Sequence, residues 1–417
     1  MVVTHRSRPD DTAPFHFLRK DHVSTATIPP SEADFAALAA PANREQALAT
    51  LDRLAEVLIG KRDFHRLFDA RMMRKKFELG LPLNRPSSLS DVPEPLRKEV
   101  EATYVEAARE AGRRFLEVGE IAQAWTYFQV LREPEAVAQA LEAVSPIAES
   151  SERLEELIHV ALIQGVNPAK GLQLMLKAHG TCSTITTLDQ TLQTLPPEQR
   201  QACAKVMLRS LYDDVTESVR RDVERRIPGL PPGESLRALI TGRDWLLESG
   251  NYHVDVSHLH AVIRFARSLE PPTEELDLAL QLCEYGQRLA EPLQYAGEPP
   301  FVDYYPAHAA FFRALQDKDR EKSLQYFRDQ LANEPDEADK PLLAYVLVDL
   351  LSRVGRLDEA VDVASIWLTN LSEDVRVSFS DLCLQANRSD ALRDAARRNG
   401  DLVTYATALV SGLSPAR

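Results

Sequence analysis

Three histidines and one aspartate lie within eight residues in the stretch HVDVSHLH, residues 253–260 of this 417-residue chain. Imidazole and carboxylate side chains are ligands of zinc and related ions, and a zinc site needs three or four of them. His253, Asp255 and His258 supply three ligands only if the chain turns sharply before a helix begins. The stretch therefore predicts a candidate metal or ligand site, to which the neighbouring Tyr252 also belongs.

The same residues are also typical of a helix start. Asp and Ser are preferred N-cap residues, so Asp255 or Ser257 is expected to cap a helix that runs toward Leu269. A projection at 100° per residue puts His258 at the edge of the apolar face and His260 on the opposite side, in water. In this interpretation His258 is half-buried and bonds to the capping carboxylate. The sequence leaves both interpretations open.

A second cluster follows the sequence KAHG, where a helix is expected to end at Gly180 and the next to open at Thr181. Cys182 then lies at a helix N-terminus, where the helix dipole favours a thiolate. His179 is three residues away, and a Cys–His pair is the minimum for a thiol nucleophile. An anion contact at the same terminus and ordinary helix capping are the alternatives.

Two weaker candidates lie elsewhere in the chain. Glu156 and His159 have the i, i+3 spacing of di-iron helical bundles, but such a site needs a second pair and two more glutamates. Tyr304 and His308 cluster with phenylalanines that are expected in the core. In a helical array these two side chains are candidates to line a binding groove.

Composition excludes several classes of protein. The formal net charge of −14 disfavours nucleic acid, because phosphate binding needs a basic surface. No apolar run is long enough to span a membrane, and no secretory signal is expected. The four cysteines are scattered without a CxxC pair, which indicates a cytoplasmic protein without a zinc ribbon. No common nucleotide-binding or hydrolase motif is present, so we expect no cofactor and leave open whether the chain is an enzyme.

Nearly every segment after Ser31 has an apolar period near 3.6 residues, which is typical of helices. Helices are expected over 44–60 and 62–80, and glycine or proline stands at many helix boundaries. No segment alternates as a strand does. The sequence therefore predicts an all-α chain.

Three segments, 104–136, 305–338 and 340–374, share one pattern of two helices around a turn. Each has a small residue early in its second helix, and two have an aromatic residue four positions later. A small side chain lets antiparallel helices approach, and the aromatic fills the space beside it. The matching residues are the small Ala124, Ser323 and Ala360, the aromatic Phe128 and Phe327, the turn glycines Gly119 and Gly355, and the terminating Pro134 and Pro335.

This pattern resembles the tetratricopeptide repeat family. The family's early tryptophan is absent, and the glycine of its first helix is present only as Gly112. The resemblance implies an α-solenoid, a right-handed superhelix of antiparallel helical hairpins with a concave binding surface.

Four parts of the chain are expected. They are an extended or partly disordered arm over 1–30, helical hairpins over 31–145, an irregular helical region over 146–300 and helical repeats over 301–417. The expected function is a scaffold that binds a peptide or protein in a concave groove. The alternative is an enzyme or a small-ligand or metal-binding protein with a pocket in the irregular region.

Overall fold

The structure, a computed structural model, describes residues 27–147, 149–227, 229–368 and 378–411. This part of the chain contains nineteen α-helices and no strand, apart from one isolated β-bridge between Ala296 and Asp303. The prediction of an all-α chain is therefore confirmed. Residue contacts divide the chain into two compact units that meet in sequence between Ala178 and His179. The finer boundaries at 145 and 300 stay predictions, and most of the expected arm, residues 1–26, lies outside the described residues.

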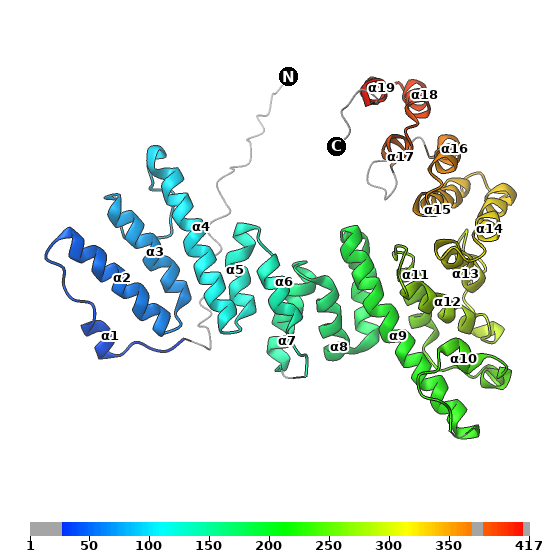
Figure 1. Cartoon of the computed structure of the whole chain (residues 1–417), viewed down its shortest axis with the longest axis horizontal. Helices are drawn as coiled ribbons and strands as arrows, with labels where there is room; N and C mark the ends of the chain where they lie inside the picture. Colours follow the sequence, from blue (N-terminus) through cyan, green and yellow to red (C-terminus); the bar gives the residue numbers. More distant parts are fainter. Residues whose placement is uncertain (1–26, 148, 228, 369–377, 412–417) are drawn as a thin grey trace, which may run out of the picture. The chain divides into compact units, whose positions relative to one another are not determined.

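Unit 1 is a series of helices, most of which pack against the next helix along the chain (Figure 1). Its helices are α1 (Glu32–Ala36), α2 (Arg44–Gly60), α3 (Phe64–Glu78), α4 (Glu94–Glu117), α5 (Ile121–Leu131), α6 (Glu135–Glu142), α7 (Ser151–Ile158) and the first part of α8 (Pro168–Thr191). A π-helical turn, His159–Ile163, follows α7 directly.

Capping residues set the boundaries of α2 and α3. The Asn43 side chain accepts a hydrogen bond from the Gln46 amide at the start of α2, and Asp63 does the same for Arg66 at the start of α3. Gly80 follows α3 with a φ of 70°, a conformation that glycine adopts without steric cost. The helices predicted over 44–60 and 62–80 are confirmed.

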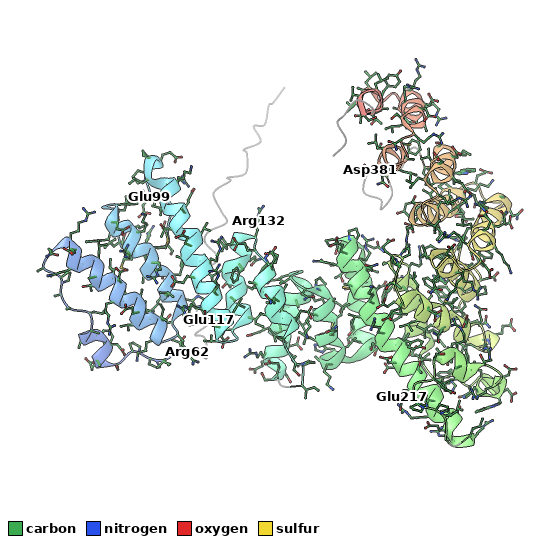
Figure 2. The ribbon with its side chains drawn as sticks, viewed as in Figure 1. Arg62, Glu99, Glu117, Arg132, Glu217 and Asp381 are labelled. Atoms are coloured by element: carbon green, nitrogen blue, oxygen red, sulfur yellow. The ribbon has the colours of Figure 1, made fainter. Side chains whose placement is uncertain are left out.

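The hairpin of α4 and α5 depends on one glycine. A Cβ atom at Gly112 of α4 would lie 2.7 Å from the ring of Phe128 in α5, so only glycine lets the two helices pack this closely. Ala124 of α5 is also fully buried. Arg132, labelled in Figure 2, ends α5 in the left-handed conformation with a φ of 57°.

Unit 2 begins with a less regular group of helices around the long helix α9 (Pro197–Arg226). Three helices pack against it, namely α10 (Leu236–Ile240), α11 (Val256–Ala266) and α12 (Glu275–Gly286). The buried side of α9 is a row of apolar residues at helical spacing, such as Leu208, Leu211, Val215 and Val219.

The rest of unit 2 is again a series in which each helix packs against the next one along the chain. Its helices are α13 (Tyr304–Leu315), α14 (Arg320–Asn333), α15 (Lys340–Arg353), α16 (Leu357–Trp367), α17 (Phe379–Gln385), α18 (Ser389–Asn399) and α19 (Leu402–Val410). The expected helix pairs α13–α14 and α15–α16 are both present, and Ser323 and Ala360 are buried in them. The end of the third predicted repeat, 369–374, lies outside the described residues.

Replacing Ala360 by leucine is expected to destabilise unit 2 by about 1–3 kcal/mol, because the side chain is fully buried where α16 packs on α15. Urea unfolding followed by circular dichroism measures the change. Ala332→Leu is the matched control, since Ala332 is exposed on α14. Equal stability of the two variants would contradict the close contact at Ala360.

Candidate functional site

His253 lies in a network with two residues that are distant in the sequence. Its Nε2 atom is 3.3 Å from Asp222 Oδ2 of α9, and its Nδ1 atom is 3.2 Å from the hydroxyl of Tyr285 in α12. The Tyr285 hydroxyl also accepts a hydrogen bond from the His253 amide at 2.8 Å. One neutral tautomer satisfies all three contacts, with the hydroxyl donating to Nδ1 and Nε2 donating to Asp222.

This Asp–His–Tyr arrangement has the order of groups that activates a hydroxyl nucleophile. Tyr285 is fully buried, however, and burial raises its pKa to about 12. The hydroxyl therefore keeps its proton and is out of reach of a substrate. The three residues hold the segment before α11 against α9 and α12. Asp222 and Tyr285 could not be predicted as partners of His253, because each lies about thirty residues from it and has no local signal.

Asp255 caps α11, as one of the two interpretations predicted. Its Oδ1 atom accepts hydrogen bonds from the Ser257 amide at 2.8 Å and from the Ser257 hydroxyl at 2.6 Å. The hydrogen bonds from Ser257 hold the Asp255 pKa below its usual value. His258 follows in the first turn and is half-buried, and Tyr252 is exposed. Within the described residues, no three His, Cys, Asp or Glu side chains are placed to hold a metal ion.

His260 is half-buried against aromatic rings, so the prediction that it lies in water is wrong. Its ring lies 4.4 Å from the ring of Tyr295 and 5.2 Å from that of Tyr304, between ring centroids. Burial lowers the His260 pKa to about 4. The helical projection placed His260 correctly on the side of Arg264, but it did not show that the segment before α13 covers part of that side.

Tyr304 and His308 are buried, so neither lines an open surface of unit 2. His308 Nδ1 donates to the Tyr304 carbonyl at 2.8 Å, and its ring stacks on Phe301 with centroids 4.2 Å apart. Burial, with the nearby Arg267, lowers the His308 pKa to about 3. The expectation that these two side chains line a groove is therefore corrected, since they belong to the core between α11 and α13.

The helix break expected at Gly180 is present, with a φ of 76° inside the segment assigned to α8. Both His179 and Cys182 are exposed beside this break, and Cys182 forms no disulfide. The threonine hydroxyls that follow bond to carbonyls one turn earlier, as Thr184 does to Gly180 at 2.8 Å. These hydrogen bonds lie within the helix and do not involve the Cys182 thiol. A role of Cys182 as a nucleophile or anion contact therefore stays a prediction.

The Glu156–His159 pair lies where α7 changes into the π-helical turn. The side-chain Nε2 of Gln164 donates a hydrogen bond to His159 Nε2 at 2.9 Å, and the side-chain Oε1 of Gln164 accepts one from the indole of Trp125. Gly171 of α8 packs on this turn, because a Cβ there would lie 2.7 Å from Leu162 Cβ. Glu156 and His159 are both exposed, and only His159 takes part in these hydrogen bonds.

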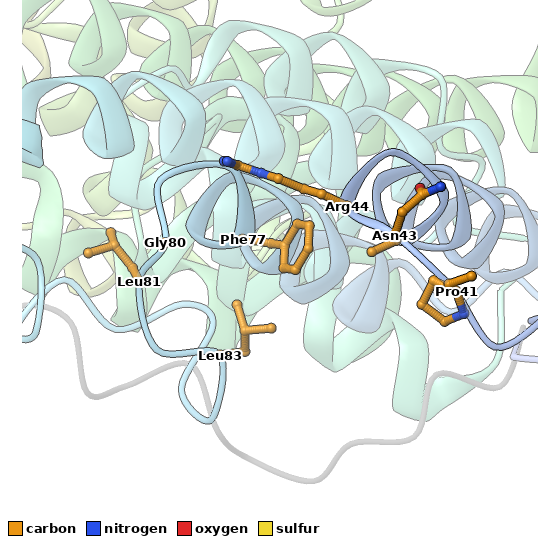
Figure 3. Close-up of a pocket in the computed structure, with 9 residues that line it drawn as sticks. Pro41, Asn43, Arg44, Phe77, Gly80, Leu81 and Leu83 are labelled. Carbon is orange, nitrogen blue, oxygen red and sulfur yellow. The ribbon is translucent and has the colours of Figure 1, made fainter.

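An open hollow of about 620 Å³ lies in unit 1 between the start of α2 and the end of α3 (Figure 3). Most of its lining is apolar, and the Arg44 guanidinium donates to the Glu78 carbonyl at 2.6 Å beside it. The lining residues are Pro41, Ala42, Asn43, Arg44, Ala47, Phe77, Gly80, Leu81 and Leu83. No site was predicted in this region. The one signal was the pair of leucines in LPLN, directly after the helix that ends near Gly80.

Comparisons with protein-family models, with curated proteins and with solved structures give no match. In the described part of the chain, no helix combines the length and apolar character needed to cross a membrane.

Replacing Asp255 by alanine is expected to cost about 0.5–2 kcal/mol of stability, because the N-cap of α11 loses its side-chain acceptor. Urea unfolding measures the cost, with Glu248→Ala as the control at an exposed acidic position. A cost no larger than that of the control would show that the cap contributes nothing.

The stability of unit 2 is expected to fall as the pH is lowered from about 6.5 toward about 4. His260 and His308 have folded-state pKa values below the ordinary 6.5, so the unfolded chain binds more protons in this window. Each histidine contributes a slope of at most about 1.4 kcal/mol per pH unit, and less for the half-buried His260.

Urea unfolding at pH 7.5, 6.5, 5.5 and 5.0 tests this expectation. His260→Phe should flatten the slope, because the neutral imidazole that takes up a proton on unfolding is removed. An identical slope in the wild-type and His260→Phe chains would contradict the buried, neutral state of His260.

Proposed function

We propose that this chain is a helical-repeat scaffold of the tetratricopeptide type that binds a peptide or protein partner. The proposal includes a right-handed superhelix of hairpins within each repeat series. The support is the packing of consecutive helices in both units and the close α4–α5 contact at Gly112 and Phe128. Folds of this kind expose extended surfaces because each repeat contacts only its neighbours.

The open hollow beside α2 and α3 is the observation that carries the proposal. Its walls include Pro41, Phe77, Leu81 and Leu83, so an apolar side chain that enters it leaves water and gains contacts. Leu83 is 36% exposed, which leaves apolar surface at the mouth for a partner to cover. The net charge of −14 favours a partner that is neutral or basic outside the anchoring residue.

The same proposal places the scaffold in the cytoplasm. All four cysteines, Cys182, Cys203, Cys283 and Cys383, are free of disulfides, which fits a reducing compartment.

A peptide-display selection on the full chain tests the proposal. Selected peptides are expected to share a large apolar residue and to bind the wild-type chain at least tenfold more tightly than Ala47→Trp, which fills the hollow. The control is Ala102→Trp, because Ala102 is exposed on α4 away from the hollow lining, and binding should be retained. Failure to select any peptide, or equal binding to Ala47→Trp, would contradict the proposal.

A further inference from the structure

Helix α8 is shared between the two units, because the boundary between them falls inside its range. In the first part of the helix, Leu172 and Leu174 are fully buried and belong to unit 1. In the second part, Leu188 is fully buried and belongs to unit 2. The next residue, Asp189, pairs with Arg264 of α11 at 2.9 Å. Each part of α8 therefore packs within a different unit.

The joint between the two parts, residues 177–183, has no buried side chain. At its middle, Gly180 has a φ of 76° and a ψ of 178°, which kinks the helix. Residues with a Cβ essentially do not adopt this conformation, so the kink depends on glycine. A Cβ atom at Gly180 would meet no other part of the protein within 4 Å, so close packing does not require a glycine there. The position needs glycine for its backbone freedom alone.

Gly180 can also adopt the α-helical conformation, in which α8 becomes one straight helix. The Thr184 hydroxyl donates to the Gly180 carbonyl at 2.8 Å, a bond of the same kind as those of the later threonines in α8. That carbonyl moves with the second part of the helix, so the bond survives rotation about the φ and ψ bonds of Gly180. Glycine forms helix less readily than any residue except proline, which keeps the straight form from dominating.

We propose that α8 is a hinge, in which Gly180 exchanges between the kinked and the α-helical conformation. The exchange redirects the chain where it passes from unit 1 to unit 2. It displaces no buried side chain of the joint, because residues 177–183 have none. A partner that binds both units would favour one form and shift the balance toward it. The inference does not depend on the peptide-binding function, since it concerns only the backbone of α8.

Double electron–electron resonance on the full chain tests the proposal. Spin labels are attached at Gln173→Cys and Gln190→Cys, two exposed positions on the two parts of α8. Cys182→Ser removes the exposed cysteine, and the other three cysteines are buried. The chain with Gly180 is expected to show two label separations, one for each form of the joint.

Gly180→Ala should leave one separation, because alanine favours the helical conformation and is strained in the kinked one. It should be that of a straight helix, whose rise of about 1.5 Å per residue puts positions 173 and 190 roughly 26 Å apart. Ser183→Ala is the matched control, since Ser183 is exposed in the same joint, and both separations should remain.

Three outcomes would overturn the proposal. A single separation in the chain with Gly180 would show that the joint is fixed. Two separations that persist in Gly180→Ala, with an unchanged helical circular dichroism spectrum, would place the moving part outside Gly180. A single separation in Gly180→Ala that differs from that of the straight helix would show that the α-helical form of the joint does not occur.

Discussion

Most helices of this chain cover their apolar stripes with the helices that come before and after them in the sequence. This constraint explains why a small residue is needed at the closest helix contacts. At Gly112 the ring of Phe128 occupies the space that a Cβ would take, and at Ala360 the buried methyl leaves room for α15.

Most of the polar residues that the sequence offered as candidates for metal binding or catalysis hold backbone segments in place. Asp255 holds the start of α11, and the Asp222–His253–Tyr285 network holds the segment before it. The irregular part of unit 2 depends on these contacts more than the hairpins do. Three helices pack against α9, and their positions are not set by packing of each helix against the next one along the chain. The imidazoles of His260 and His308 are part of the same packing, and burial keeps both neutral near pH 7.

Local sequence patterns predicted well where helices lie and where they begin and end. The range 44–60 and the cap at Asp255 could be read from apolar spacing and capping chemistry alone, since both depend on residues within one or two turns. The environment of His260 could not be predicted in this way. A helical projection does not show that a segment more than thirty residues away, which contains Tyr295, covers that side of α11. The partners of His253 were missed for the same reason. The hollow could not be predicted because it joins the start of α2 and the loop before it to the end of α3 and the loop after it, and no local pattern shows that these two regions meet.

Hydrogen exchange measured by mass spectrometry on a Leu382→Ala chain tests the neighbour-by-neighbour packing most directly. Leu382 is buried in α17, which packs against α16 and α18. If each helix is stabilised only by the helices next to it, the substitution should speed amide exchange in α16, α17 and α18. Exchange in α11 and α12 should remain unchanged. An equal acceleration throughout the described part of unit 2 would contradict the account, because it would show one cooperative core instead of a series of local contacts.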